Sequence, residues 1–242
     1  MSMELYNILA DEYDNIFPVD KELVNFVKAV FPNKKELLID AGCASGALAV
    51  SLAFDGYSIM GIDSGEYMIK KAAEKIKSGM KAEFVKADIL TIDKLPQAQG
   101  VLCFGNTLPH LKSNEEVLQF FGGVHKILQS GGNFVFELLN YDKILCMENF
   151  SFKDIYTEKF VFKRSYNFND KRHIIFTAEL TDKQTGECSS SSVNLLPLRK
   201  KDLSELLKES GFIFTAYEDY NGTPSSGKEF ATTYICSRKA SA

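Results

Sequence analysis

Apolar and polar positions in the first 140 residues follow two alternating spacings. Short apolar runs predict strands at 37–40, 57–62, 82–85, 100–104 and 133–139. Apolar positions three or four residues apart predict helices at 20–31, 47–53, 66–77 and 114–128. Because strands low in charge alternate with helices, we expect an α/β fold whose parallel sheet is covered on both faces.

The spacing changes after residue 140. Aromatic residues become frequent and partly alternate with polar ones over 150–162 and 166–180, and a turn signature follows at 182–186. This pattern is typical of antiparallel strands. It predicts a β-rich insertion at 141–198 that forms a lid.

The last segment returns to the first pattern. Helical spacing is found at 203–210, and two apolar runs, 212–217 and 230–236, predict a closing β-hairpin. The sequence therefore predicts one α/β domain, made of 1–140 and 199–242, that is interrupted by the insertion.

Charge and composition exclude several classes of protein. The 28 Lys and Arg residues are outnumbered by 32 Asp and Glu residues, so the net charge of −4 argues against a nucleic-acid partner. The start has no basic segment leading into an apolar one, and the longest apolar stretch, 47–54, is too short to span a bilayer. We expect a cytoplasmic protein without a membrane partner. The five scattered cysteines suit neither a disulfide framework nor a zinc site.

The end of the first predicted strand carries the strongest chemical signal. The small residues of 41–46 let a ligand approach the backbone, and the next helix offers free N–H groups. The second strand ends in Asp63, whose carboxylate suits the two hydroxyls of a ribose. Both features fit a dinucleotide dehydrogenase and an adenosyl-cofactor enzyme equally well.

Further motifs favour the adenosyl cofactor. Asp40-x-Gly42-x-Ala44-x-Gly46 resembles the D/E-x-G-x-G-x-G motif of class I S-adenosylmethionine (SAM) methyltransferases, with alanine replacing the middle glycine. Other segments resemble the family's later motifs in the right order: 6–14, 61–72, 86–90, 102–111 and 127–135. The segment 102–111, together with Asn140-Tyr-Asp142, is similar to glycine/sarcosine N-methyltransferases. The resemblance implies a Rossmann-like, seven-stranded methyltransferase sheet with a reversed last hairpin.

The resemblance also implies a site. SAM would be bound by Tyr13, Asp40, Gly42, Cys43, Ala44, Gly46, Asp63, Ser64, Met68, Asp88, Ile89, Phe104, Gly105 and Asn106. In this hypothesis Asp63 holds the ribose, Met68 packs on the adenine and Asp88 accepts from the adenine amino group. No metal is required, because the sulfonium already activates the methyl group.

The methyl acceptor has its own candidate residues: Asn106, His110, Tyr141 and Arg164. His110 is a conceivable proton acceptor, although it equally suits a structural role at the cofactor wall. Arg164 suits a carboxylate or phosphate of the acceptor, or simply a solvated strand position.

The sequence thus predicts a SAM-dependent methyltransferase acting on a small-molecule acceptor, with nitrogen as the favoured atom. Two alternatives stay open: a SAM-binding protein without transferase activity, and an NAD-dependent oxidoreductase. The oxidoreductase is disfavoured by Ala44, which interrupts the G-x-G-x-x-G fingerprint, and by the loop at Asp88. No motif identifies the acceptor or the oligomeric state.

Overall fold

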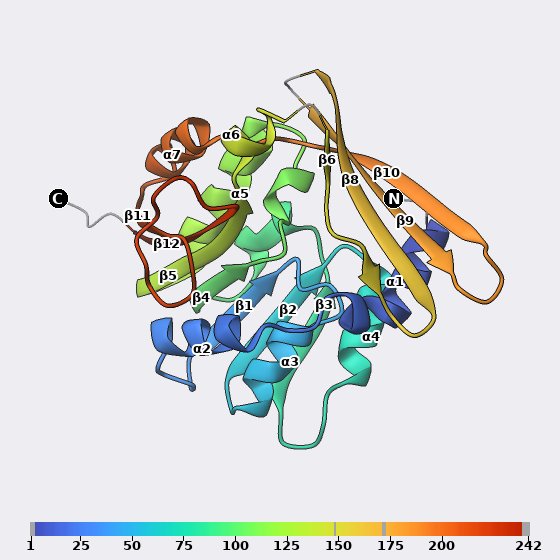
Figure 1. The fold of residues 1–242 in the computed structure, drawn as a ribbon. Coiled ribbons are helices and arrows are strands. Elements are labelled where there is room, and N and C mark those ends of the chain that lie inside the picture. The colour runs from blue at the N-terminus through green and yellow to red at the C-terminus, as the bar shows by residue number, and fades with distance from the viewer. Residues whose placement is uncertain (1–2, 148, 171–172, 239–242) are drawn as a thin grey trace.

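A computed structural model describes residues 3–147, 149–170 and 173–238. It contains a seven-stranded sheet in the order β11-β12-β5-β4-β1-β2-β3 (Figure 1). The strands are β1 (Leu37–Ala41), β2 (Ser58–Asp63), β3 (Lys81–Lys86), β4 (Ala98–Cys103), β5 (Leu128–Leu139), β11 (Phe212–Tyr217) and β12 (Ala231–Arg238). β12 runs antiparallel to both of its neighbours, whereas the other pairs are parallel. The predicted Rossmann-like sheet with a reversed closing hairpin is confirmed.

Helices cover both faces of this sheet. The helices are α2 (Lys21–Val30), α3 (Ala47–Phe54), α4 (Glu66–Glu74), α5 (Asn114–Ile127), the short α6 (Tyr141–Ile144) and α7 (Lys200–Glu209). Residues of α2 and α3 share one apolar cluster with the sheet, and residues of α5 and α7 share another. The two clusters bury almost all of the apolar side chains of β1, β4 and β5, which explains why these strands read as apolar runs.

The helix boundaries differ from the predicted ones by one to three residues, and two of these differences have a local cause. The helix predicted at 66–77 ends at Glu74 with Lys75 as its C-cap, and a turn with Gly79 at φ +89° follows a few residues later. The helix predicted at 114–128 ends at Ile127, and β5 then begins at Leu128 rather than after the glycines. The pairing of β4 with β5 shifts register between Ala98 and Gly100. This irregularity accommodates the positive φ of Gly131 within β5.

A second, antiparallel sheet forms the insertion. Its strands follow the order β10-β9-β8-β6, with β7 also pairing with β8. The strands are β6 (Phe150–Ser151), β7 (Ile155–Tyr156), β8 (Phe160–Asp170), β9 (His173–Asp182) and β10 (Cys188–Leu195). β8 runs through 163–165, between the two aromatic-rich stretches of the sequence, and Phe162 and Tyr166 are both buried on the same side of the strand.

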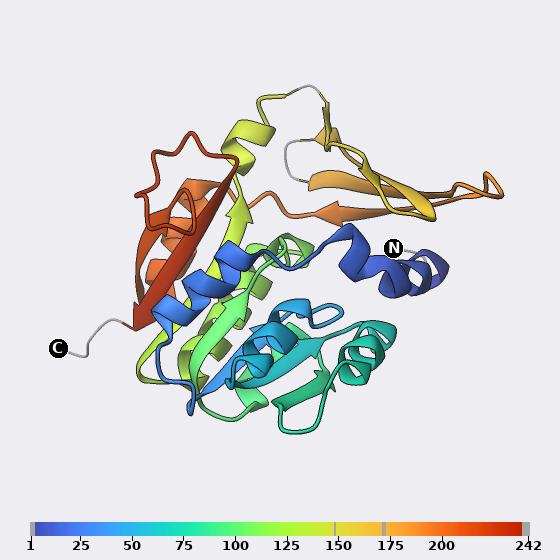
Figure 2. The ribbon, with the colours of Figure 1, turned by 60° about the horizontal axis from the view of Figure 1, so that its bottom comes forward.

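The N-terminal helix α1 (Met3–Ile16) lies between this second sheet and α4 (Figure 2). Leu9 and Ile16 of α1 share an apolar cluster with Met68 of α4 and with Phe162 and Leu180 of the insertion. The helix therefore joins the insertion to the part of the α/β domain that contains α4.

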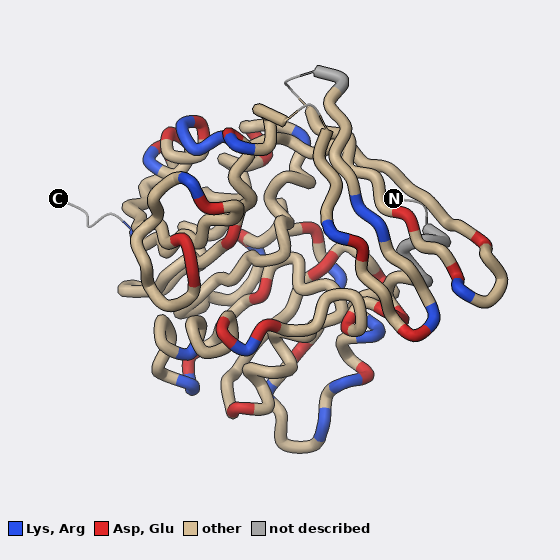
Figure 3. Tube along the Cα trace, viewed as in Figure 1, with Lys and Arg blue, Asp and Glu red and all other residues tan. Residues whose placement is uncertain are grey.

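Charged side chains are interspersed along the trace rather than gathered by sign (Figure 3). No helix among the described residues has the length and apolarity needed to cross a bilayer.

Phe134 lies at the aromatic centre of the larger apolar cluster, so we expect the stability of the fold to depend strongly on it. Its side chain is fully buried, and its ring lies 4.8–6.0 Å from those of Phe120, Phe121, Phe136 and Phe212. Phe134→Ala should lower the free energy of unfolding by about 3–5 kcal/mol through a cavity that cannot collapse. Urea denaturation measures this loss.

The matched control is Phe54→Ala, since the Phe54 side chain is 74% exposed. This variant should change the free energy of unfolding by less than about 0.5 kcal/mol. Equal losses in the two variants would contradict the position of Phe134 in the core.

Candidate functional site

A cavity of about 430 Å³ opens at the carboxyl ends of β1, β2 and β4. This is the edge at which open α/β sheets bind ligands. Its lining includes these residues selected from the sequence: Tyr13, Gly42, Ala44, Asp63, Ser64, Asp88, Ile89, Gly105 and His110. The structure therefore brings together residues from five separate segments of the chain.

The turn after β1 forms one wall of the cavity. Gly42 and Ala44 have φ values of +78° and +47°, and the N–H groups of Gly42 and Cys43 donate to the Ile62 carbonyl at 2.8 and 3.0 Å. A Cβ on Gly42 would lie 2.5 Å from the Thr107 side chain, so only glycine fits there. Ala44 adopts the left-handed conformation that its place in a glycine motif suggests, at a cost of order 1 kcal/mol.

Asp63 lies at the centre of the wall. Its two carboxylate oxygens accept from the Ala44 N–H at 3.0 Å and from the Gly65 N–H at 2.8 Å. Burial raises the pKa of Asp63, and the two N–H donors oppose that rise. A carboxylate oxygen accepts more than one hydrogen bond, so both oxygens retain capacity for the hydroxyls of a ribose.

Asp88 caps a short helix and also lines the cavity. Its carboxylate accepts from the Leu90 N–H at 2.9 Å and caps the 3₁₀ helix η1 (Ile89–Lys94). The same residue lines the cavity beside Ile89. The cap fixes the loop, and the exposed carboxylate keeps acceptor sites for a ligand such as an adenine amino group.

Other selected residues lie behind the lining. The following residues selected from the sequence do not line the cavity: Asp40, Cys43, Gly46, Met68, Phe104, Asn106, Tyr141 and Arg164. Met68 is buried against α1, and Phe104 packs in the cluster of α2 and α3. Gly46 begins α3 with φ +76°, and a Cβ there would meet the Phe84 ring at 2.7 Å. These residues shape the wall from behind.

The sequence did not select several residues of the lining: Leu90, Thr107, Leu111, Lys112, Glu116 and Val193. Glu116 was detectable as the third residue of a capping pattern after Ser113, and its carboxylate accepts from the Lys112 N–H at 2.8 Å. Val193 belongs to β10, and only the packing of the insertion over the sheet brings it to the cavity.

A polar cluster stands next to the cavity. Asn106, at φ +61°, follows Gly105 of the lining, and its Nδ2 donates to the hydroxyl oxygens of Tyr141 at 2.9 Å and Tyr166 at 3.3 Å. Burial raises the pKa of Tyr166 to about 12 and that of Tyr141 well above its usual value. Both phenols therefore stay protonated at neutral pH. The cluster unites two residues expected to meet the acceptor with Tyr166, which no motif indicated.

His110 lines the cavity from the 3₁₀ helix η2 (Leu108–His110). Desolvation lowers the pKa of its imidazole, so the ring is neutral at pH 7 and able to accept a proton. Arg164 lies among three aromatic rings, of Phe17 just after α1 and of Phe152 and Phe162 in the insertion, instead of on the cavity wall.

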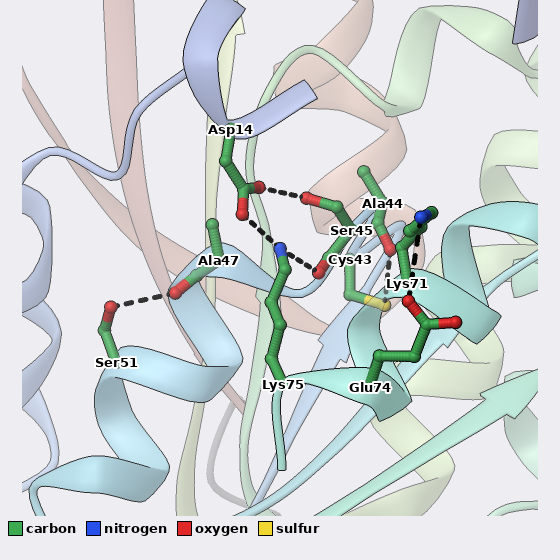
Figure 4. A network of polar contacts seen from close by, with 9 residues as sticks. All are labelled: Asp14, Cys43, Ala44, Ser45, Ala47, Ser51, Lys71, Glu74 and Lys75. Atoms are coloured by element: carbon green, nitrogen blue, oxygen red, sulfur yellow. Dashed lines mark hydrogen bonds and ion pairs between the residues drawn. The ribbon is translucent and has the colours of Figure 1, made fainter. Parts of the chain in front are cut away.

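Hydrogen bonds and ion pairs hold α1 against the cavity (Figure 4). The Asp14 carboxylate accepts from the Ser45 hydroxyl and from Lys75, and Lys75 also donates to the Ser45 carbonyl at 2.8 Å. Asp11 pairs with Lys71 at 2.6 Å. These contacts tie α1, which carries Tyr13 of the lining, to the turn after β1. Among the described residues no group of three or more His, Cys, Asp or Glu side chains is arranged to hold a metal ion.

Because Asp40 is a buried acid, we expect the free energy of unfolding to depend on pH. Burial, followed by the charge of Asp63, raises the pKa of Asp40 from 3.8 to about 7. The unfolded chain releases this proton at lower pH than the folded one, so the contribution of Asp40 to stability falls as pH rises from about 4 to 7. Asp40→Asn should therefore be more stable than the parent at pH 8, by an amount on the order of 1–4 kcal/mol, and the gap should close towards pH 4.

Thermal and urea unfolding between pH 4 and 8 measure this gap. Glu83→Gln, at an exposed position of β3, serves as the control and should show no such trend. A constant gap for Asp40→Asn across the pH range would show that Asp40 is ionised throughout.

Comparisons with known proteins agree with this geometry. Residues 38–132 match the family model of a methyltransferase domain. The chain is 26% identical over 214 residues to a glycine/sarcosine N-methyltransferase of Aphanothece halophytica, a match that covers 82% of this chain and 74% of the relative. YqeM of Bacillus subtilis, provisionally named a methyltransferase, is 28% identical over 144 residues, and the match spans 58% of its length.

Solved structures share the fold. A SAM-dependent methyltransferase of Clostridium acetobutylicum superposes with a TM-score of 0.83 over 98% of this chain and 100% of its own, at 18% identity. The SAM-bound amino pentose methyltransferase CalS10 of Micromonospora echinaspora superposes with a TM-score of 0.71 over 90% of this chain and 89% of its own, at 15% identity. Residues 38–132 are thus similar to a methyltransferase domain, and the chain as a whole has the fold of solved class I SAM-dependent methyltransferases, with its cavity at the carboxyl ends of β1, β2 and β4.

Proposed function

We propose that this protein transfers the methyl group of SAM to a nitrogen atom of a small molecule. The observation that carries this proposal is the cavity itself, whose wall presents Asp63 and Asp88 on one side and Gly105, next to Asn106, on the other. Supporting it, relatives from three organisms are named glycine or glycine/sarcosine N-methyltransferases.

The residues fit SAM in distinct ways. Asp63 offers acceptor sites for the ribose hydroxyls, and Asp88 offers one for the adenine amino group. The turn at Gly42 and Ala44 lets the backbone approach the amino-acid part of SAM. In this proposal Tyr13 covers that part from α1.

SAM supplies a methyl group already activated by its sulfonium, so the chain needs only to orient the acceptor, exclude water and receive a proton. Asn106 and the two phenols bonded to it are fixed by mutual hydrogen bonds next to Gly105. The neutral His110 imidazole is a candidate to accept the proton that the nitrogen releases.

A small acceptor follows from the position of the insertion. We propose that 141–198 is a lid, because β10 contributes Val193 to the cavity and α1 packs under β8 and β9. Such a roof leaves room for a compact molecule and keeps bulk water away from the nucleophile.

The first test is calorimetric titration with S-adenosylhomocysteine and, separately, with NAD. We expect micromolar binding of the first and none of the second, because the wall lacks the second glycine of the dinucleotide fingerprint. A screen of radiolabelled methyl transfer to small amines follows. Binding of S-adenosylhomocysteine without transfer to any amine would favour a SAM-binding protein without transferase activity, and binding of NAD alone would favour an oxidoreductase.

Asp63→Ala tests the ribose contact. The change removes charge-assisted hydrogen bonds from a buried polar ligand, so affinity for S-adenosylhomocysteine should fall by at least about 1.5–3 kcal/mol. Glu83→Ala on the exposed side of β3 should leave that affinity unchanged. Equal affinities of Asp63→Ala and the parent protein would rule out the assigned role of Asp63.

A further inference from the structure

Arg164 sits in an unusual environment for an arginine. It lies on β8 between the buried residues Phe162 and Tyr166, two positions away from each. Its guanidinium carbon lies 4.6 Å from the ring centroid of Phe152, 5.1 Å from that of Phe17 and 5.7 Å from that of Phe162. These rings come from the insertion and from the segment after α1, so the guanidinium is enclosed where the lid meets the α/β domain.

The charge of Arg164 has no protein counterpart in the part of the chain that the structure describes. Its guanidinium makes no ion pair or hydrogen bond there, and its Nε is buried without an acceptor. Burial lowers the pKa of Arg164, yet an arginine keeps its charge at any physiological pH. The residue is half-buried, and of its nitrogens only Nε is a buried atom without a partner, so the two terminal nitrogens are reachable from outside while the guanidinium stays incompletely satisfied.

The aromatic rings satisfy the guanidinium only in part. A ring face attracts the cation, but an aromatic carbon ring does not accept the in-plane N–H bonds of the guanidinium as an oxygen does. The group that completes an arginine fork is a planar carboxylate or a phosphate, which accepts two parallel N–H bonds. The environment therefore holds a cation whose fork has no anionic partner among the described residues and is able to donate to the anion of a ligand.

The neighbours of Arg164 indicate which ligand. Its electrostatic interactions are with Tyr166 and Tyr13. The Tyr166 hydroxyl accepts from Asn106, which follows the cavity residue Gly105, and Tyr13 itself lines the cavity. Arg164 thus neighbours both Tyr166 of the polar cluster and Tyr13 of the cavity lining, and it lies on the same strand, β8, as Tyr166.

Resting on the proposed function, we propose that the methyl acceptor is an amine that carries a carboxylate or a phosphate, and that Arg164 binds this anionic group. The anion anchors one end of the acceptor in the aromatic enclosure, and the polar cluster at Asn106 orients the other end. Neutral amides or esters of the same amines should then be poor acceptors.

Binding to Arg164 can be observed directly by NMR. The chain has four arginines, so their Nε–H signals are few, and Arg164→Lys identifies the signal of Arg164 by its loss. With the protein saturated by S-adenosylhomocysteine, sodium acetate and inorganic phosphate are titrated separately, with acetamide as the neutral control. A saturable shift of the Arg164 signal with acetate alone assigns a carboxylate, and a shift with phosphate alone assigns a phosphate.

Two results of this titration would overturn the proposal. One is an Arg164 signal that responds to neither anion more than to acetamide. The other is a shift caused by S-adenosylhomocysteine itself, together with loss of its binding in Arg164→Gln, since Arg164 would then hold the carboxylate of the cofactor.

Kinetics of the variants provide an independent test with the best anionic amine from the transfer screen. Arg164→Gln should raise the KM for that amine about 10- to 100-fold, the range of a lost charge-assisted hydrogen bond. Arg164→Lys should lie between Arg164→Gln and the parent, because lysine keeps the charge but loses the fork. The affinity for S-adenosylhomocysteine should stay within about twofold of the parent, as only acceptor binding is affected.

Arg199→Gln is the matched control, because Arg199 is exposed and pairs with Asp142 outside the cavity. If Arg164 had only a structural role, Arg164→Gln would lower the melting temperature and would weaken the methylation of anionic and neutral acceptors alike. That result would contradict the proposal. If the parent protein binds S-adenosylhomocysteine and methylates neutral amines as well as charged ones, only this inference fails. If it binds no S-adenosylhomocysteine, the proposed function fails first.

Discussion

The cofactor wall depends on the hydrogen bond between the Ala44 N–H and the Asp63 carboxylate. It joins the turn after β1 to the end of β2 and fixes the direction of a carboxylate that would otherwise rotate freely. The bond forms only because Ala44 adopts a positive φ and because β1 and β2 pair in register up to Ala41 and Ile62. The positive φ of Ala44 costs little free energy, and the contacts of the surrounding residues offset that cost. A turn held in this way presents its N–H groups and its acid without rearrangement when a ligand arrives.

The same turn explains why α1 has so many polar contacts. Ser45 follows Ala44 directly, and its hydroxyl and carbonyl are both bonded within the cluster of Asp14 and Lys75. The salt bridges are partly exposed and each contributes little to stability. Their role is to position α1, which carries Tyr13 of the cavity lining. The apolar contacts of Leu9 and Ile16 supply most of the binding energy of this helix.

The sequence predicted the features that depend on local periodicity. Strands, helices and the carboxyl-end acids Asp63 and Asp88 follow from apolar spacing and from the rule that parallel strands expose the same ends. The enclosure of Arg164 could not be predicted, because it needs rings from two distant segments, and their proximity depends on the register of β8. For the same reason Tyr166 escaped detection, although its neighbour in the polar cluster, Asn106, lies in a recognisable motif. Long-range packing, rather than composition, decides such contacts.

The insertion shares no strand with the seven-stranded sheet. The acids and turns of the cofactor wall lie on one sheet, whereas Arg164 and Tyr166 lie on the other. The two sheets meet through side chains, since Tyr166, Ile174 and Leu195 of the insertion pack in the same apolar cluster as residues of the seven-stranded sheet. Substitutions on β8 to β10 that keep these three side chains buried leave the hydrogen bonds of Asp63 intact. If the insertion recognises the acceptor as proposed, a lineage of such proteins can change its acceptor by altering one sheet while the other stays unchanged.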